Sequence, residues 1–196
     1  DCQGIETLIE LYPVESHYGN ARIVQQYLHD DDSQPVHRQG QIHWQANGNG
    51  FLLSIPNEEP LYFKVEENQL RWLAKNGDVV TGELSEHYVL TKQPAHARTL
   101  LSVSGIEWQL SELGDQAVTT NIPTLTITLD GQVAGFSGCN QFAGQIELDA
   151  TQALFGPLMS TRRACFAPTV EPEFLAALAK VDYFSVNASG YLLLSD

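Results

Sequence analysis

Apolar and polar residues alternate along most of the first half of the chain. Stretches with this two-residue period occur at 5–12, 41–45, 61–66 and 70–74, and 21–29 is a further candidate strand. Asn- and Gly-rich stretches at 47–50 and 76–78 lie between them, and both residue types tolerate the positive φ angles of tight turns. Strands at this spacing, without a convincing helix between them, predict an antiparallel meander that closes toward a small barrel.

The alternation fades at 91–104 and returns in the second half of the chain. Candidate strands there lie at 108–110, 124–129, 145–149, 184–186 and 191–194. Asp130-Gly131 predicts a hairpin turn within this region. We therefore expect two domains, at residues 1–95 and 104–196.

One segment, at 171–181, has the period of a helix instead. Its apolar stripe is formed by Phe174, Leu175, Leu178 and Val181. Thr169 can cap the N-terminus, Pro172 is tolerated in the first turn, and the acidic Glu171 suits the helix dipole there. The predicted fold is therefore mainly β, with two small antiparallel β-barrel-like domains and a single helix packed on the second.

Composition and charge exclude several classes of partner. A hydrophobic content of 43% is enough to form a core, whereas a net charge of −14 and a pI of about 4.6 make the surface acidic. Such a surface repels the phosphates of nucleic acids and anionic lipid headgroups. No apolar run approaches the roughly 20 residues that span a bilayer. We expect no nucleic-acid partner, and membrane attachment only through a lipid anchor upstream of Asp1.

Candidate catalytic and metal-binding residues are few. The histidines are at 17, 29, 37, 43, 87 and 96, so none lies in the second half with Cys139 and Cys165. The usual thiol-protease arrangement and the common Cys/His zinc patterns are therefore excluded there. Ser137 lies in a sequence close to Gly-x-Ser-x-Gly, but Cys139 replaces the last glycine, and a turn explains the glycines better. We predict no catalytic activity, cofactor or metal site, and for the two cysteines a disulfide and a pair of buried thiols both remain open.

Two stretches of the second half, 135–144 and 161–165, have unusually specific sequences. Together they resemble the paired signature of the META (HslJ-like) domain, a small β-rich module of bacterial envelope proteins. The residues that match are Gly138, Cys139, Asn140, Gly144, Thr161, Arg162, Ala164 and Cys165. Arg163 and Phe166 depart from the family, which usually has Met and often Pro at these positions, and we expect these changes to affect only the packing beside Cys165.

This resemblance brings no reaction with it, and its residues have structural interpretations. A bond between Cys139 and Cys165 would close a loop of about 25 residues and would stabilise the domain by about 3–4 kcal/mol. Arg162 either pairs with an acid of its own domain, which is the interpretation that we favour, or points outward to an acidic partner.

The start of the chain has a second resemblance. Asp1-Cys2-Gln3-Gly4-Ile5-Glu6-Thr7 is similar to the end of the Cys-x-x-Cys-x-Gly-Ile-x-Thr motif of NlpE-like lipoproteins. That family has a lipocalin-like N-terminal barrel and is linked to copper resistance and to envelope stress. The resemblance implies that Cys2 is a redox or lipoprotein-motif cysteine, that its motif partner lies upstream, and that Gly4 and Ile5 are motif residues.

These observations predict a non-enzymatic bacterial cell-envelope lipoprotein on the periplasmic side of the outer membrane. It would act in envelope stress sensing or copper homeostasis through contacts with an envelope protein partner. Two alternatives remain. The N-terminal barrel could carry a small apolar ligand in a cavity lined by side chains that could equally fill it, namely Trp44, Phe63, Leu70 and Trp72. The chain could also bind copper through a Cys-x-x-Cys pair completed upstream of Asp1.

Overall fold

A computed structural model describes residues 4–15, 18–28, 33–46, 48–93, 100–149, 152–165 and 169–196. The chain divides into two compact units, Asp1–Pro94 and Ala95–Asp196, which are described separately below. Several positions that the sequence singles out lie outside the described residues: Cys2, His17, His29, His96 and Phe166.

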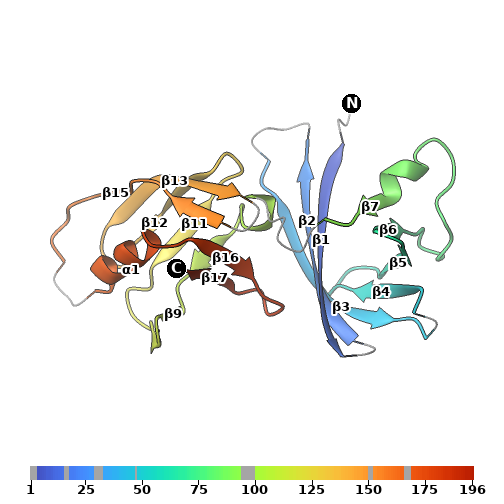
Figure 1. Cartoon of the computed structure of the whole chain (residues 1–196), viewed down its shortest axis with the longest axis horizontal. Helices are drawn as coiled ribbons and strands as arrows, with labels where there is room; N and C mark the ends of the chain where they lie inside the picture. Colours follow the sequence, from blue (N-terminus) through green and yellow to red (C-terminus); the bar gives the residue numbers. More distant parts are fainter. Residues whose placement is uncertain are drawn as a thin grey trace. The chain divides into compact units, whose positions relative to one another are not determined.

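The first unit contains a seven-stranded antiparallel sheet in which every strand pairs with the next one along the chain (Figure 1). Its strands are β1 (Ile5–Glu15), β2 (Tyr18–Tyr27), β3 (Val36–Trp44), β4 (Gly50–Ser54), β5 (Leu61–Glu66), β6 (Gln69–Trp72) and β7 (Val89–Thr91), with a short 3-10 turn, η1 (Ser85–Tyr88), before β7. The sheet is nearly closed, and the barrel-like meander predicted from the alternation is confirmed.

Aromatic side chains occupy the interior of this first unit. Phe51 and Phe63 are fully buried, and their ring centroids are 5.1 Å apart. Trp44 packs on Phe51 at 5.1 Å, and Trp72 packs on Phe63 at 5.3 Å. Leu70 is partly buried against the same core. Because the side chains considered for a ligand cavity contact the core and one another, these contacts favour a filled interior.

The second unit contains an eight-stranded antiparallel sheet, ordered β17-β16-β14-β13-β12-β11-β8, with β15 paired to β13 beside this path. Its strands are β8 (Glu107–Gln109), β11 (Thr124–Ile127), β12 (Gln132–Phe136), β13 (Gln141–Asp149), β14 (Gln152–Phe155), β15 (Met159–Ser160), β16 (Tyr183–Val186) and β17 (Leu192–Ser195). A 3-10 turn, η2 (Leu100–Ser102), precedes the sheet, and β9 (Glu112–Leu113) and β10 (Gln116–Ala117) form a separate small hairpin.

The helix of this unit, α1 (Glu171–Leu178), packs on the sheet through its apolar stripe (Figure 1). Phe174 meets Phe142 of β13 edge to face, with ring centroids 5.8 Å apart. The helix ends three residues before the predicted end at Val181. The N–H of Val181 donates to the carbonyl of Leu178, and the chain then turns into β16. Val181 is nevertheless buried, so the stripe extends past the helix.

The two units thus share the predicted class, mainly β with two barrel-like antiparallel sheets and one α-helix in the second. Among the described residues, no helix is long and apolar enough to cross a membrane.

Candidate functional site

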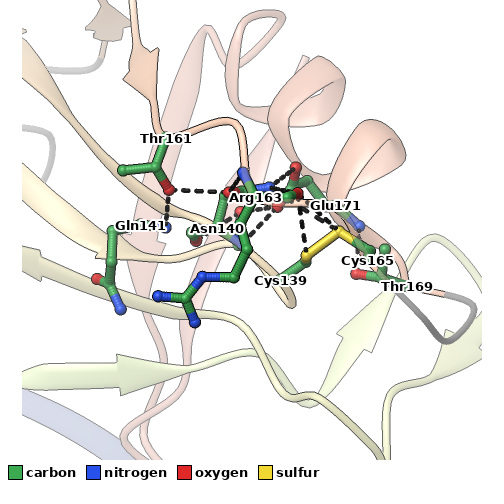
Figure 2. Close-up of a disulfide and its surroundings, with 9 residues drawn as sticks. Cys139, Asn140, Gln141, Thr161, Arg163, Cys165, Thr169 and Glu171 are labelled. Carbon is green, nitrogen blue, oxygen red and sulfur yellow. Dashed lines mark hydrogen bonds between the residues drawn. A yellow bond between two sulfur atoms is a disulfide. The ribbon is translucent and has the colours of Figure 1, made fainter.

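The two specific stretches of the second half meet in space. Residues 137–140 form the turn between β12 and β13, and residues 161–165 follow β15 without a turn or bend (Figure 2). A disulfide joins Cys139 to Cys165, with their Cα atoms 6.0 Å apart, inside the usual range for this bond. Cys165 is exposed and Cys139 half-buried, so the alternative of two buried thiols is wrong.

Asn140 is the centre of the hydrogen bonds around this bridge. Its side chain is 5% exposed, and its Oδ1 accepts hydrogen bonds from the Thr161 hydroxyl at 2.8 Å and the Arg163 N–H at 2.7 Å. Its Nδ2 donates to Glu171 Oε1 at 2.9 Å and to the Arg163 carbonyl at 3.3 Å. A primary amide has two donors and two lone pairs, so these four bonds satisfy it completely.

Glu171, in the first turn of α1, holds the other side of this cluster. Its Oε2 accepts the main-chain N–H of Asn140 at 2.8 Å and lies within hydrogen-bonding distance of the Ser137 hydroxyl. Burial is the largest single influence on the pKa of Glu171 and raises it. The hydrogen bonds from Ser137 and from the side chain and main chain of Asn140 together outweigh burial, so the pKa lies below the ordinary 4.5. We call Ser137, Asn140, Thr161, Arg163 and Glu171 the Asn140 cluster.

The geometry of the Asn140 cluster is that of a structural clamp. Ser137 is fully buried, and its hydroxyl is directed to the Asn140 carbonyl and to Glu171, so it cannot reach a substrate as a nucleophile. The Arg163 carbonyl lies 3.9 Å from the Cys139 sulfur and 3.7 Å from the Cys165 sulfur. Those are packing contacts, because a disulfide has no S–H to donate. The cluster therefore joins the β12–β13 turn, segment 161–165 and α1.

The start of the helix is also tied to this turn. Val170 directly precedes α1 and makes no side-chain cap, but the Thr169 hydroxyl accepts the Glu171 N–H at 3.2 Å. Thr169, the predicted capping residue, thus binds the first helical N–H, although it lies one residue before the N-cap position. Gly138 lies beside it: a Cβ on Gly138 would be 2.6 Å from the Thr169 hydroxyl, and the φ of Gly138 is 106°.

We expect Gly138→Ala to lower the free energy of unfolding of the second unit by about 2 kcal/mol, because the new methyl group meets Thr169 and the φ angle is unfavourable for L residues. Gly114→Ala is the matched control. Gly114 also has a positive φ, 59°, but open space around it, so the loss there should be about 1 kcal/mol. Equal losses in a denaturant titration of both variants would show that the contact with Thr169 has no energetic effect.

The remaining motif residues lie outside the Asn140 cluster. Gly144 lies in β13, where a Cβ would approach Leu158 Cδ2 to 2.7 Å. Ala164 is exposed in the segment that ends at the bridge. In the first unit, Gly4 has a φ of 132° and Ile5, which begins β1, is 45% exposed.

Arg162 and Arg163 are both exposed. Neither forms an ion pair with any residue that the structure describes, so the acid within the domain that we expected for Arg162 is not found there. Figure 2 shows the Arg163 side chain extending away from the hydrogen bonds of the cluster, to which only its main chain contributes.

A second polar cluster, which the sequence does not indicate, lies on β1–β3. Arg22 is 3% exposed; its Nη1 pairs with Glu10 at 3.1 Å and its Nη2 lies 2.8 Å from His37 Nδ1. Because a guanidinium only donates, Nδ1 of His37 is the acceptor and is not available to a metal. Within the described ranges, no group of three His, Cys, Asp or Glu side chains could hold a metal ion.

The pKa of Glu171 predicts how the stability of the second unit depends on pH. A carboxylate whose pKa is lowered by folding stabilises the fold fully above its unfolded value, near 4.5, and this stabilisation is lost as pH falls through the folded pKa. We therefore expect the free energy of unfolding to fall below pH 4.5 more steeply in the wild type than in Glu171→Gln. Glu173→Gln, which removes an exposed carboxylate from the same helix turn, is the control. Parallel pH profiles for wild type and Glu171→Gln would contradict the assignment.

Comparisons with known proteins find a similar domain family for each half of the chain. Residues 1–83 match the model of the NlpE N-terminal domain, and residues 101–196 match the model of the META domain. No curated protein matches the chain. One similar solved structure is the crystal structure, at 1.42 Å resolution, of a "putative lipoprotein" from Shewanella oneidensis. It is 28% identical, with a TM-score of 0.34, over 44% of this chain and 86% of that one. Both resemblances inferred from the motifs are confirmed.

Proposed function

Because this chain joins an NlpE N-terminal domain to a META domain, we propose that it works as a bacterial cell-envelope lipoprotein that acts through protein contacts. Its role would be in envelope stress sensing or copper homeostasis, on the periplasmic side of the outer membrane, without catalysis. The envelope assignment agrees with the two domain types, and the more specific role extends what the NlpE resemblance implies.

The disulfide supports the envelope assignment on physical grounds. Cys165 is exposed, so reducing agents of a cytosol would reach the bridge. Disulfides persist in oxidising compartments such as the bacterial periplasm and are rare where glutathione and thioredoxin keep thiols reduced. A bridge with one exposed cysteine is therefore what a periplasmic domain is expected to have.

The observation that carries the proposal of a non-enzymatic role is the internal saturation of the Asn140 cluster. All four hydrogen-bonding positions of the Asn140 amide are used within the domain, and Glu171 is held by Asn140 and Ser137. Four residues of the family signature are thus engaged in holding segment 161–165 in place, namely Cys139, Asn140, Thr161 and Cys165. This arrangement suits a rigid surface that other proteins contact, because positions fixed in advance lose little entropy on binding.

Fractionation of cells that make the tagged natural protein tests the compartment. We expect the protein in the envelope fraction, with Cys139 and Cys165 unreactive toward an alkylating agent until a reductant is added. Recovery in the cytosolic fraction with both cysteines alkylated would overturn the envelope assignment. A photo-crosslinking experiment in intact cells tests the contact: a specific envelope protein should be captured, and repeated capture of none would overturn the proposed mode of action.

A further inference from the structure

Positive charge is concentrated at one place in the second unit. Residues 100–196 contain ten Asp and Glu but only three Lys and Arg, namely Arg162, Arg163 and Lys180. The two arginines are adjacent and exposed, and in the part of the chain that the structure describes neither meets an acid. In a chain of net charge −14, with ten acids in this unit alone, two unpaired cations side by side are available to a negatively charged partner.

The same residues continue a short strand at the edge of the sheet. β15 pairs with β13 through Met159 opposite Ala143 and Ser160 opposite Phe142. The pairing extends one residue further, since the Thr161 N–H donates to the Gln141 carbonyl at 2.9 Å. No strand among the described residues pairs with the other side of β15.

Alternate main-chain groups along this outer edge are directed away from the sheet. In an antiparallel ladder, alternate residues turn their N–H and C=O toward opposite sides. The N–H of Thr161 and the N–H of Arg163 both point inward, to the Gln141 carbonyl and to Asn140 Oδ1. The N–H and C=O groups of Ser160 and Arg162, which alternate with them, therefore face outward.

The two arginines lie on opposite faces of this edge. The inward N–H groups of Thr161 and Arg163 alternate as they do in a strand, in which neighbouring side chains point to opposite faces. Every residue from 159 to 165 is exposed, with Met159 at 73%. A flat anionic surface, such as a membrane, could approach one face and reach one arginine. An extended chain lying beside the edge would place its own neighbouring side chains next to both.

We propose that β15 and segment 161–165 bind an extended acidic segment of a protein partner as an added strand. The main-chain groups of Ser160 and Arg162 supply the ladder hydrogen bonds, and the two arginines pair with adjacent carboxylates of the segment, one on each face. The disulfide and Asn140 fix this edge before binding, which lowers the entropy lost on docking. The proposal rests on the proposed function in that the partner is a protein, and it gives that contact a location.

Fluorescence anisotropy with the full chain tests this. The probe is a labelled, terminally blocked octapeptide of Val and Thr with two adjacent glutamates at its centre, and the control peptide has two glutamines there. We expect saturable binding of the acidic peptide, weakened about tenfold or more by glutamines in the peptide or by the Arg162→Gln/Arg163→Gln double variant. Lys180→Gln, which removes the third Lys or Arg of residues 100–196, should bind as the wild type does.

Ser160→Pro separates strand addition from simple charge attraction. It keeps both arginines and removes only an outward N–H, a position where an edge strand tolerates proline. We expect it to abolish peptide binding while the amide signals of β13 stay unchanged. Wild-type binding by Ser160→Pro, the absence of saturable binding to the wild type, or arginine-dependent binding to anionic phospholipid vesicles in place of the peptide would each overturn the proposal.

Crosslinking in cells distinguishes a failure of this proposal from a failure of the proposed function. If the Arg162→Gln/Arg163→Gln variant still crosslinks to the envelope protein that the wild type captures, this edge is not the contact, although the proposed function stands. If the wild type captures no protein but binds the peptide as described, the edge binds acidic strands and the proposed function is wrong.

Discussion

Replacing Cys139 and Cys165 together by serine is expected to lower the free energy of unfolding of the second unit by about 3–4 kcal/mol. The bridge closes a loop between residues 26 positions apart, and the chain-entropy model assigns about this much to a loop of that size. Serine is close to cysteine in size, so the Asn140 cluster should still form in the folded state. The loss arises chiefly from the greater freedom of the unfolded chain.

The measurement is a denaturant titration of the full chain, followed through amide signals of β13 for the second unit and of β2 for the first. Both proteins carry Cys2→Ser, which removes the third cysteine and with it any mispairing. The β2 signals should report the same stability in both proteins, because the first unit contains neither bridged cysteine. A loss below about 1 kcal/mol would show that the bridge constrains the unfolded chain little.

The sheets of both units could be predicted because one face of most strands is buried. In β11, Leu125 and Ile127 are buried while Thr124 and Thr126 are less so, and this alternation is visible in the sequence. β4, in which Phe51, Leu52 and Leu53 are all apolar, shows no such alternation and was not predicted. β15 could not be found this way. It has two residues, both exposed, and its place is set by main-chain bonds to β13 and by the Asn140 amide. Such bonds produce no periodic pattern of apolar and polar residues in the sequence. The separate hairpin of β9 and β10 is equally short.

The candidate site could be predicted in part. The motifs brought Cys139, Asn140, Thr161 and Cys165 to attention as one signature, but gave no role to the asparagine. Glu171 was interpreted from its own neighbourhood, as an acid in the first turn of a helix. Its principal partner, Asn140, is 31 residues away in sequence, so no local pattern could indicate the bond. The exposure of Cys165 could not be predicted either, because it depends on how the turn and segment 161–165 pack.

Asn140→Ala is expected to lower the free energy of unfolding of the second unit by about 3 kcal/mol or more, although it removes only a small amide group. It leaves the Arg163 N–H and the Thr161 hydroxyl without their acceptor and takes one donor from the ionised Glu171. A hydrogen bond contributes about 0.5–1.5 kcal/mol net, or about 1.5–3 kcal/mol when one partner is charged, so the four bonds that the buried amide makes account for this loss together. Gln141→Ala, which changes the adjacent exposed side chain, should stay within about 0.5 kcal/mol of the wild type.

Exchanging the amide and the acid tests whether the pairing itself matters. Asn140→Asp alone places a second carboxylate where Nδ2 lies 2.9 Å from Glu171, so it should destabilise at neutral pH and recover partly in acid, where the pair can share a proton. Adding Glu171→Gln restores one donor and one acceptor across the contact. The double variant should therefore be more stable at neutral pH than Asn140→Asp alone, a favourable coupling that a double-mutant cycle measures. If the two losses simply add, the two side chains act independently and the clamp between α1 and the β12–β13 turn does not work through their bond.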